Sequence, residues 1–195
     1  YTKDETLTTP ESLAGKTIGG PVGTNLHELL AAYLATAGMT IDDVNYVNMS
    51  IPDAMAGLEG GSLDVAMIAG ATAYQAEQSG YHLIADGEGL IDADIAVAVT
   101  GEFYEEHPEI IEKLVEAQET IADFMENNHD ETMEIVANAL DLDVAAVEDM
   151  YGDYDFSIEV TDKDREGFQK TADFMLEAGM IENEPDVNSL FVTAE

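Results

Sequence analysis

The chain has 195 residues, with 42 Asp and Glu against 6 Lys and Arg, and its formal net charge is −36. A surface this acidic repels phosphate backbones and anionic lipid, which excludes nucleic acid and argues against an anionic membrane as a partner. The absence of cysteine excludes disulfides, thiol nucleophiles and thiolate-bound metals, while the 46% apolar residues are enough for a folded core.

The first half of the chain alternates predicted strands and helices. Residues 1–15 are polar and predict an extended connector. Alternation of strands and helices predicts a parallel or mixed sheet of about four or five strands, with helices on its faces. The strands are expected at 16–20, 44–49, 63–69 and 81–85, and the helices between Asn25 and Gly38, at 52–58 and at 71–78.

The start of the first helix has a specific sequence signature. Asn25 is followed three residues later by Glu28, which predicts a capping box that begins the helix at Asn25. Leucines recur after it at helical spacing, and Gly38 is expected to end the helix.

From residue 94 the pattern changes from alternating to helical. One more strand is expected at 94–100, and after it Pro108 begins a long helix. Shorter helices are expected at 130–139 and 143–151, and Thr161 with Asp164 opens a last one. Helices that lack a sheet of their own predict that part of a second lobe is missing. We therefore expect their apolar faces to be exposed or to contact another chain.

Five segments carry a family pattern when they are taken in order. They are SLAGKTIGGPVGTNLHELL (12–30), AGMTIDDVNYVNM (37–49), IPDAMAGLEGGSLDVAMI (51–68), FYEEHPEIIEKLVEAQETIADFMENN (103–128) and FQKTADFMLEAGMI (168–181). No single segment is specific. The ordered set resembles bacterial solute-binding proteins of the nitrate/sulfonate/taurine and thiamine-precursor group.

The resemblance implies an α/β fold of the type II periplasmic-binding-protein class. On this reading residues 1–15 are a connector or hinge, 16–90 form a complete α/β lobe two, and 91–195 are the mostly helical returning segment of lobe one. The N-terminal part of lobe one has no counterpart in the sequence. Because the chain begins at Tyr1 without Met, we expect an upstream segment that includes the export signal.

A glycine-rich turn between the first strand and helix is the main candidate for a binding site. Gly23, Thr24 and Asn25 lie where the free N–H groups of a helix N-terminus attract an anion or a polar head group. An ordinary capped turn is the alternative. The negative charge of Glu28 weakens an anion site, and His27 is expected to offset it.

Further candidates follow the next two strands at their carboxyl ends, where open α/β sheets bind ligands. Asn48 ends one strand, although Ser50 beside it also fits a helix N-cap. Gly70, Thr72 and Tyr74 follow the apolar strand LDVAMIA, and Tyr74 either lines the cleft or packs. Asp64 inside that strand needs polar partners and is interpreted as structural.

Sequence signatures of catalysis and of metal binding are absent. The four histidines have no metal-ligand spacing, and neither a nucleophile elbow nor a Walker A motif is present. We therefore expect no metal, no cofactor and no catalytic residues.

The resemblance implies a non-enzymatic, extracytoplasmic receptor, periplasmic or lipid-anchored, that captures a small organic or oxyanion solute between two lobes. Its partners would be that small-molecule ligand, an ABC permease with its ATPase, and a second copy of the chain through exposed lobe-one helices. The alternatives are a receptor of a tripartite carboxylate transporter and a ligand-sensing regulatory domain. An enzyme of thiamine-pyrimidine synthesis resembles the same family, but the lack of cysteine argues against it.

Overall fold

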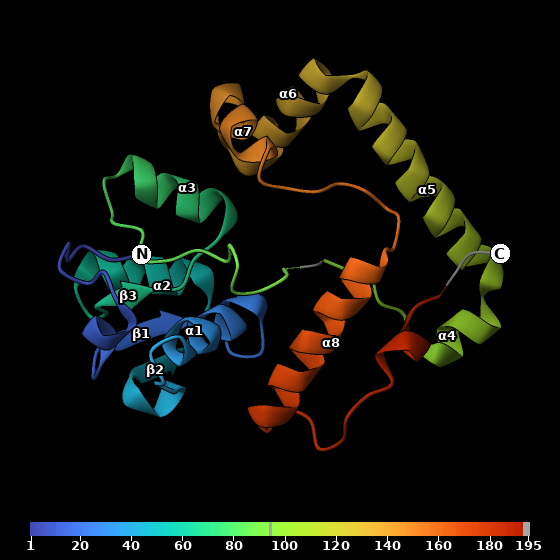
Figure 1. Cartoon of the computed structure of the whole chain (residues 1–195). Coiled ribbons are helices and arrows are strands. Elements are labelled where there is room, and N and C mark those ends of the chain that lie inside the picture. The colour runs from blue at the N-terminus through green and yellow to red at the C-terminus, as the bar shows by residue number, and fades with distance from the viewer. Residues whose placement is uncertain (94, 193–195) are drawn as a thin grey trace. The chain divides into compact units, whose positions relative to one another are not determined.

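The computed structural model describes residues 1–93 and 95–192, which belong to two compact units. The first unit comprises Tyr1–Ala93 and Glu166–Pro185, and the second comprises Asp94–Arg165 and Asp186–Glu195 (Figure 1). The assignment of residues 1–15, 16–90 and 91–195 to a connector and two lobes stays a prediction.

A parallel sheet forms the centre of the first unit. Strand β1 (Thr17–Gly20) lies between β2 (Asn45–Asn48) and β3 (Val65–Ala66), in the order β2-β1-β3. Ile18 of β1 is in register with Tyr46 of β2 and with Val65 of β3. Because all three strands run in one direction, their carboxyl ends meet at one edge of the sheet, which confirms the predicted α/β class.

The expected sheet of four or five strands is wrong, because the described residues form three strands. Thr2 takes the place beside β3 through antiparallel bridges to Val65 and to His82. The predicted strand at 81–85 is reduced to that bridge, in which the amide of Thr2 donates to the carbonyl of His82 at 2.9 Å. The predicted connector at 1–15 therefore packs against the rest of the first unit, and its Leu7 is buried in the core there.

Helices cover both faces of this sheet. Helix α1 (Asn25–Ala35) packs over one face in a cluster that includes Ile18 and Leu34. Helices α2 (Ile51–Gly60) and α3 (Gly70–Gln78) pack over the other face around Leu58. The unit also contains 3₁₀ turns at Pro10–Leu13 and Ile41–Asp43, and most of α8 (Asp162–Glu177).

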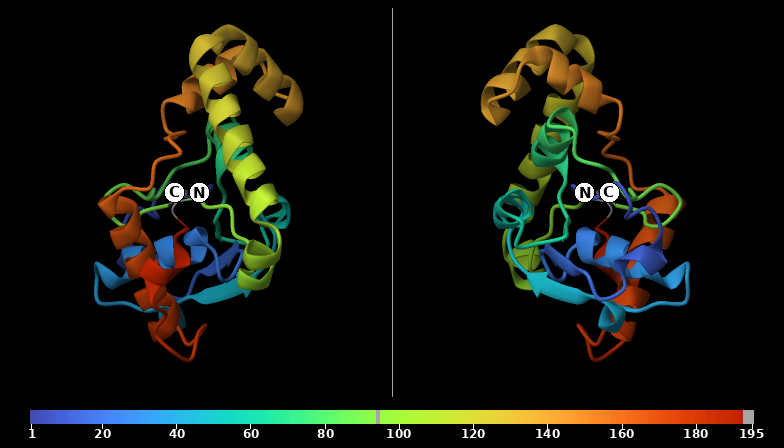
Figure 2. Two further views of the ribbon diagram at one scale, coloured as in Figure 1. Left: turned by 90° about the vertical axis from the view of Figure 1, so that its right-hand side faces the viewer. Right: turned by 90° about the vertical axis from the view of Figure 1, so that its left-hand side faces the viewer.

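The second unit is helical among its described residues. It contains α4 (Gly101–Glu106), α5 (Pro108–Asn127), α6 (His129–Leu140), α7 (Val144–Tyr151) and the 3₁₀ turn Val187–Leu190. Figures 1 and 2 show α6 and α7 packed together beyond the end of α5, and their shared core is built on Met133, Ala137 and Val147. Helix α5 has no buried residue, and Ile121 on it is 51% exposed.

The strand expected at 94–100 does not form over residues 95–100, and residue 94 lies outside the described residues. Ile95 is 87% exposed and Val97 is 68% exposed. The alternating pattern is present, but no described strand pairs with this segment, and a lone strand is not stable by itself. None of the described helices is long and apolar enough to span a membrane.

Candidate functional site

The candidate site is the turn at 21–24, which joins the carboxyl end of β1 to α1. The side chain of Asn48, at the end of β2, accepts a hydrogen bond from the amide of Val22 at 3.1 Å. The amide of Met49 donates to the carbonyl of Gly20 at 3.0 Å. Two adjacent strand ends are thus joined where the sequence predicts a ligand.

Helix α1 begins differently from the expected capping box. Thr24 is the N-cap residue, Asn25 is the first helical residue, and no side chain caps the helix. The Thr24 hydroxyl donates instead to the carbonyl of Pro21 at 3.0 Å. The amides of the first turn therefore have no acceptor within the helix or from its cap, which is the arrangement that binds anions.

His27 holds the turn from the buried side. Its Nδ1 accepts a hydrogen bond from the amide of Gly23 at 3.3 Å, and its ring stacks on Tyr46 at 5.1 Å. Burial lowers the pKa of the His27 imidazole and raises the pKa of Tyr46 to about 12. A neutral imidazole whose Nδ1 accepts a hydrogen bond carries its proton on Nε2. Since Nδ1 is occupied by the Gly23 amide, the expectation that His27 offsets the charge of Glu28 stays a prediction.

Glu28 points its carboxylate to α8 rather than to the helix N-terminus. Its two oxygens lie 3.0 and 3.3 Å from the hydroxyl of Thr171, and the residue is 7% exposed. Burial raises the pKa of the Glu28 carboxyl above its usual range, the Thr171 hydrogen bond opposes this increase, and the charge of Asp92 adds to it. The buried carboxylate is thus a cost to the fold at neutral pH.

Substitution of Glu28 by Gln should remove this cost. Since its folded pKa is raised above 4.5, ionisation of Glu28 lowers the free energy of unfolding as pH rises from about 4.5 through the folded pKa. We expect Glu28→Gln to be more stable than the wild type at pH 7, with a difference that vanishes toward pH 4. Urea denaturation at both pH values measures it.

The matched control for this prediction is Glu119→Gln on α5, an exposed position that removes the same formal charge. An equal gain in both variants at pH 7 would attribute the effect to the net charge of the chain rather than to the buried carboxylate.

The remaining candidates lie after β3. Gly70 begins α3 with φ +58°, and Thr72 and Tyr74 in its first turns are half-buried. Because these three residues follow β3, they share the carboxyl edge of the sheet with the turn at 21–24. The cleft role of Tyr74 and the binding roles of the seven candidates stay predictions.

The structure shows what Ser50 and Asp64 do beside these candidates. The hydroxyl of Ser50 accepts a hydrogen bond from the amide of Asp53, so Ser50 is the N-cap of α2. Asp64 has its expected partners, because its carboxylate accepts from the amide of Thr17 at 2.8 Å and lies 3.9 Å from Nζ of Lys16. Ser50 therefore caps a helix, and Asp64 binds the start of β1.

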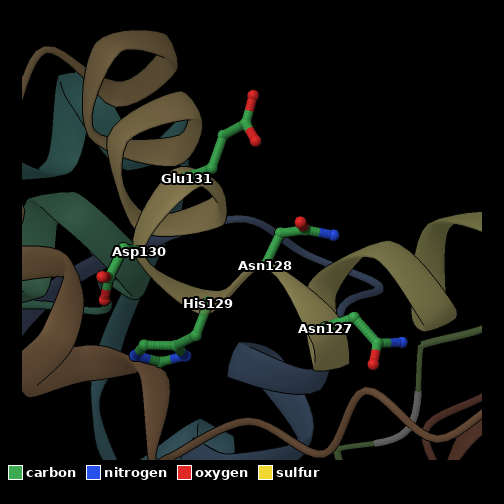
Figure 3. A pocket seen from close by; sticks show the side chains of 5 residues that line it. All are labelled: Asn127, Asn128, His129, Asp130 and Glu131. Atoms are coloured by element: carbon green, nitrogen blue, oxygen red, sulfur yellow. The ribbon is translucent and has the colours of Figure 1, made fainter.

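A separate depression occurs at the junction of α5 and α6 (Figure 3). Its side chains point in different directions instead of toward a common point, and Nε2 of His129 is engaged by the carboxylate of Glu148 at 2.9 Å. Within the described residues no group of His, Asp and Glu is arranged to hold a metal ion. The lining residues are Asn127, Asn128, His129, Asp130 and Glu131.

Three residues around the turn at 21–24 and the start of α1 were not predicted from the sequence. Tyr46 donates from its hydroxyl to the carbonyl of Pro21 at 3.2 Å, and its position inside a predicted strand did not distinguish it from a packing residue. Thr171 and Phe174 of α8 contact Glu28 and His27 across more than 140 positions of the chain. No local pattern in the sequence signals contacts of that separation.

Comparison with solved structures shows the fold. The periplasmic aliphatic sulphonate binding protein SsuA from Escherichia coli matches 100% of this chain with 64% of its own, at 18% identity and a TM-score of 0.79. The alkanesulfonate-binding protein SsuA from Xanthomonas axonopodis pv. citri, bound to MOPS, matches 93% of this chain with 64% of its own, at 19% identity and a TM-score of 0.78. The chain therefore spans just under two thirds of the length of either protein.

An enzyme shares the fold as well. A mutant of the desulfurization enzyme DSZB, in complex with biphenyl-2-sulfinic acid, matches 96% of this chain with 70% of its own, at 15% identity and a TM-score of 0.66. No curated protein matches the sequence of this chain. The family model described as NMT1/THI5 like matches residues 1–132. This match covers more than half of the sequence and agrees with the resemblance that the sequence motifs carry. The chain belongs to the NMT1/THI5-like family.

Proposed function

We propose that the chain is the solute-binding component of an ABC importer and that it binds a small organic oxyanion of the sulfonate type. The proposal rests on one observation, the turn at the carboxyl end of β1, whose shape is held by Asn48 and His27 while the first-turn amides of α1 stay without an acceptor. Such a turn binds an anionic head group through backbone N–H groups and the helix dipole.

The charges around the turn favour recognition by neutral donors. No Lys or Arg occurs in residues 20–30, 45–52 or 67–76, which surround the three strand ends. Nδ1 of His27 accepts a hydrogen bond from a backbone amide and so carries no proton, and Glu28 is turned away toward Thr171. An oxyanion would thus be held by hydrogen bonds with fixed geometry, which suits a group with several oxygens.

The ligands of the related folds support a sulfur oxyanion. Two are named as binders of aliphatic sulfonates, and one of them holds MOPS, which is itself a sulfonate. The third holds a sulfinic acid. Nitrate, taurine and thiamine-precursor ligands stay open as members of the wider group that the sequence resembles.

The ligand class is tested by calorimetric titration of the protein after unfolding and refolding to remove any bound solute. The probes are an alkanesulfonate, taurine, nitrate and a neutral aminopyrimidine. Saturable binding of the alkanesulfonate is expected. Binding of the pyrimidine alone would move the protein to a thiamine-precursor role, and binding of none of the four would contradict the proposal.

The position of the ligand is tested at Thr24. Thr24→Ala removes the hydrogen bond to the Pro21 carbonyl that shapes the turn, and we expect the binding free energy to weaken by about 1 kcal/mol, the usual value of one hydrogen bond. Thr24→Ser keeps the hydroxyl and should bind like the wild type. Because Thr24 is also the N-cap residue, a thermal melt of each variant must accompany the titration. Equal affinities in the wild type and in Thr24→Ala would place the ligand elsewhere.

The proposal carries with it an extracytoplasmic location and a membrane permease with its ATPase as partners. A non-enzymatic role is part of it, since binding and release need no covalent step. The exposed apolar side chains of α5, among them Ile110 and Ile121, support the expectation of self-association.

A further inference from the structure

The imidazole of His27 is fixed by three elements of the first unit. It stacks on Tyr46 of β2, with ring centroids 5.1 Å apart and an angle of 25° between the planes. The ring of Phe174 on α8 meets it edge-on, at 5.5 Å and 85°. His27 itself is on α1 and is 7% exposed. A ring held on its face and at a second contact has little freedom to rotate.

The same imidazole determines the backbone of the binding turn. Its Nδ1 accepts the amide hydrogen of Gly23, whose φ of +78° is a conformation that favours glycine. The hydroxyl of Tyr46, which stacks on His27, donates to the carbonyl of Pro21 at 3.2 Å. The pair of stacked rings therefore holds the turn at two points.

Helix α8 is attached to this region by polar contacts as well. The hydroxyl of Thr171 donates to the buried carboxylate of Glu28 at 3.0 Å, and Nζ of Lys170 lies 2.6 Å from the carboxylate of Asp92. Thr171 and Phe174 are three positions apart and so lie on one face of the helix. That face is directed at the start of α1.

We propose that His27 is a positioning residue for the binding turn and that α8, through Phe174, sets the affinity of the turn for its ligand. The second part of the inference, which concerns affinity, rests on the proposed function, because the ligand is the one bound at the oxyanion site. Its first part concerns the backbone of the protein alone. Phe174 touches no ligand in this scheme and acts only by restricting the imidazole that accepts the Gly23 amide.

The experiment measures hydrogen exchange of the Gly23 amide in the ¹⁵N-labelled full chain, together with calorimetric titration of an alkanesulfonate. Phe174→Ala should speed exchange at Gly23 about fivefold, the factor that corresponds to one lost hydrogen bond, and should weaken sulfonate binding by a similar factor. Met175→Ala is the matched control, because its side chain leaves the same helix about 100° away. The control should leave both measurements unchanged.

Two variants of His27 separate the acceptor from the ring. His27→Phe keeps an aromatic ring for Tyr46 but has no acceptor, so exchange at Gly23 should rise. His27→Asn loses the ring but places an oxygen near the position of Nδ1, so Gly23 should be better protected than in His27→Phe. The imidazole ¹⁵N shifts of the wild type should show a neutral ring protonated at Nε2.

Several results would overturn the inference. They are unchanged exchange at Gly23 in Phe174→Ala, an equal change in Met175→Ala, or full protection of Gly23 in His27→Phe. If Phe174→Ala does not fold, the His27 pair decides. If the wild type binds no sulfonate, the proposed function fails, whereas exchange at Gly23 still decides whether His27 and Phe174 position the turn.

Discussion

Leu34→Ala should lower the free energy of unfolding by about 2–5 kcal/mol, the range for a large aliphatic side chain removed from a closed core. Leu34 is 0% exposed and belongs to the cluster that joins α1 to one face of the sheet. The substitution removes the transfer free energy of the lost atoms and leaves a cavity that the packed sheet cannot close. Since the chain has no Trp, circular dichroism in urea is the suitable measurement.

The control for Leu34 is Leu83→Ala, at a position that is 36% exposed. Its effect should be clearly smaller, because part of the side chain is already in water. Leu34 lies near the end of α1 opposite to the turn at 21–24, so a folded Leu34→Ala protein should keep any affinity of the proposed oxyanion site. Equal losses of stability at the two positions would contradict the assignment of Leu34 to the core.

Gly20→Ala should destabilise the protein by about 1–3 kcal/mol, the usual cost of overpacking, and also disturb the turn at 21–24. A Cβ at Gly20 would lie 2.5 Å from Cβ of Met67 and 3.4 Å from the hydroxyl of Tyr46. The Cβ of Met67 is fixed to its backbone, so rotation of the methionine side chain cannot relieve the contact. Strand β1 or the segment after β3 must move instead. Urea denaturation measures the loss of stability, and calorimetry measures the loss of affinity.

The matched control is Gly60→Ala, because a Cβ at Gly60 would meet no heavy atom within 4 Å. Gly60 is the last residue of α2, where alanine has the higher helix propensity, by up to about 1 kcal/mol. The two Gly→Ala changes should therefore act in opposite directions. A Gly20→Ala protein as stable as the wild type would show that the sheet edge is looser than its packing implies.

The sequence alone predicted where most of the helices lie and where the three paired strands of the first unit lie. Helix α5 begins at Pro108 as its pattern predicts, and α2 ends before Gly61, whose φ is +75°. These features depend on residues within a few positions of each other, through helical periodicity, proline geometry and the left-handed conformation of glycine. The family resemblance came from the sequence too, because ordered motifs survive without any knowledge of contacts.

Only the tertiary structure decided which strands find partners and how the turn at 21–24 is held. Residues 81–85 pair at one position because Thr2, eighty residues earlier in the chain, occupies the edge of β3. The N-cap of α1 is Thr24 and not the predicted Asn25. Glu28 accepts a hydrogen bond from Thr171 instead of taking part in a capping box. Contacts between residues so far apart depend on the packing of whole elements, and local periodicity carries no information about them.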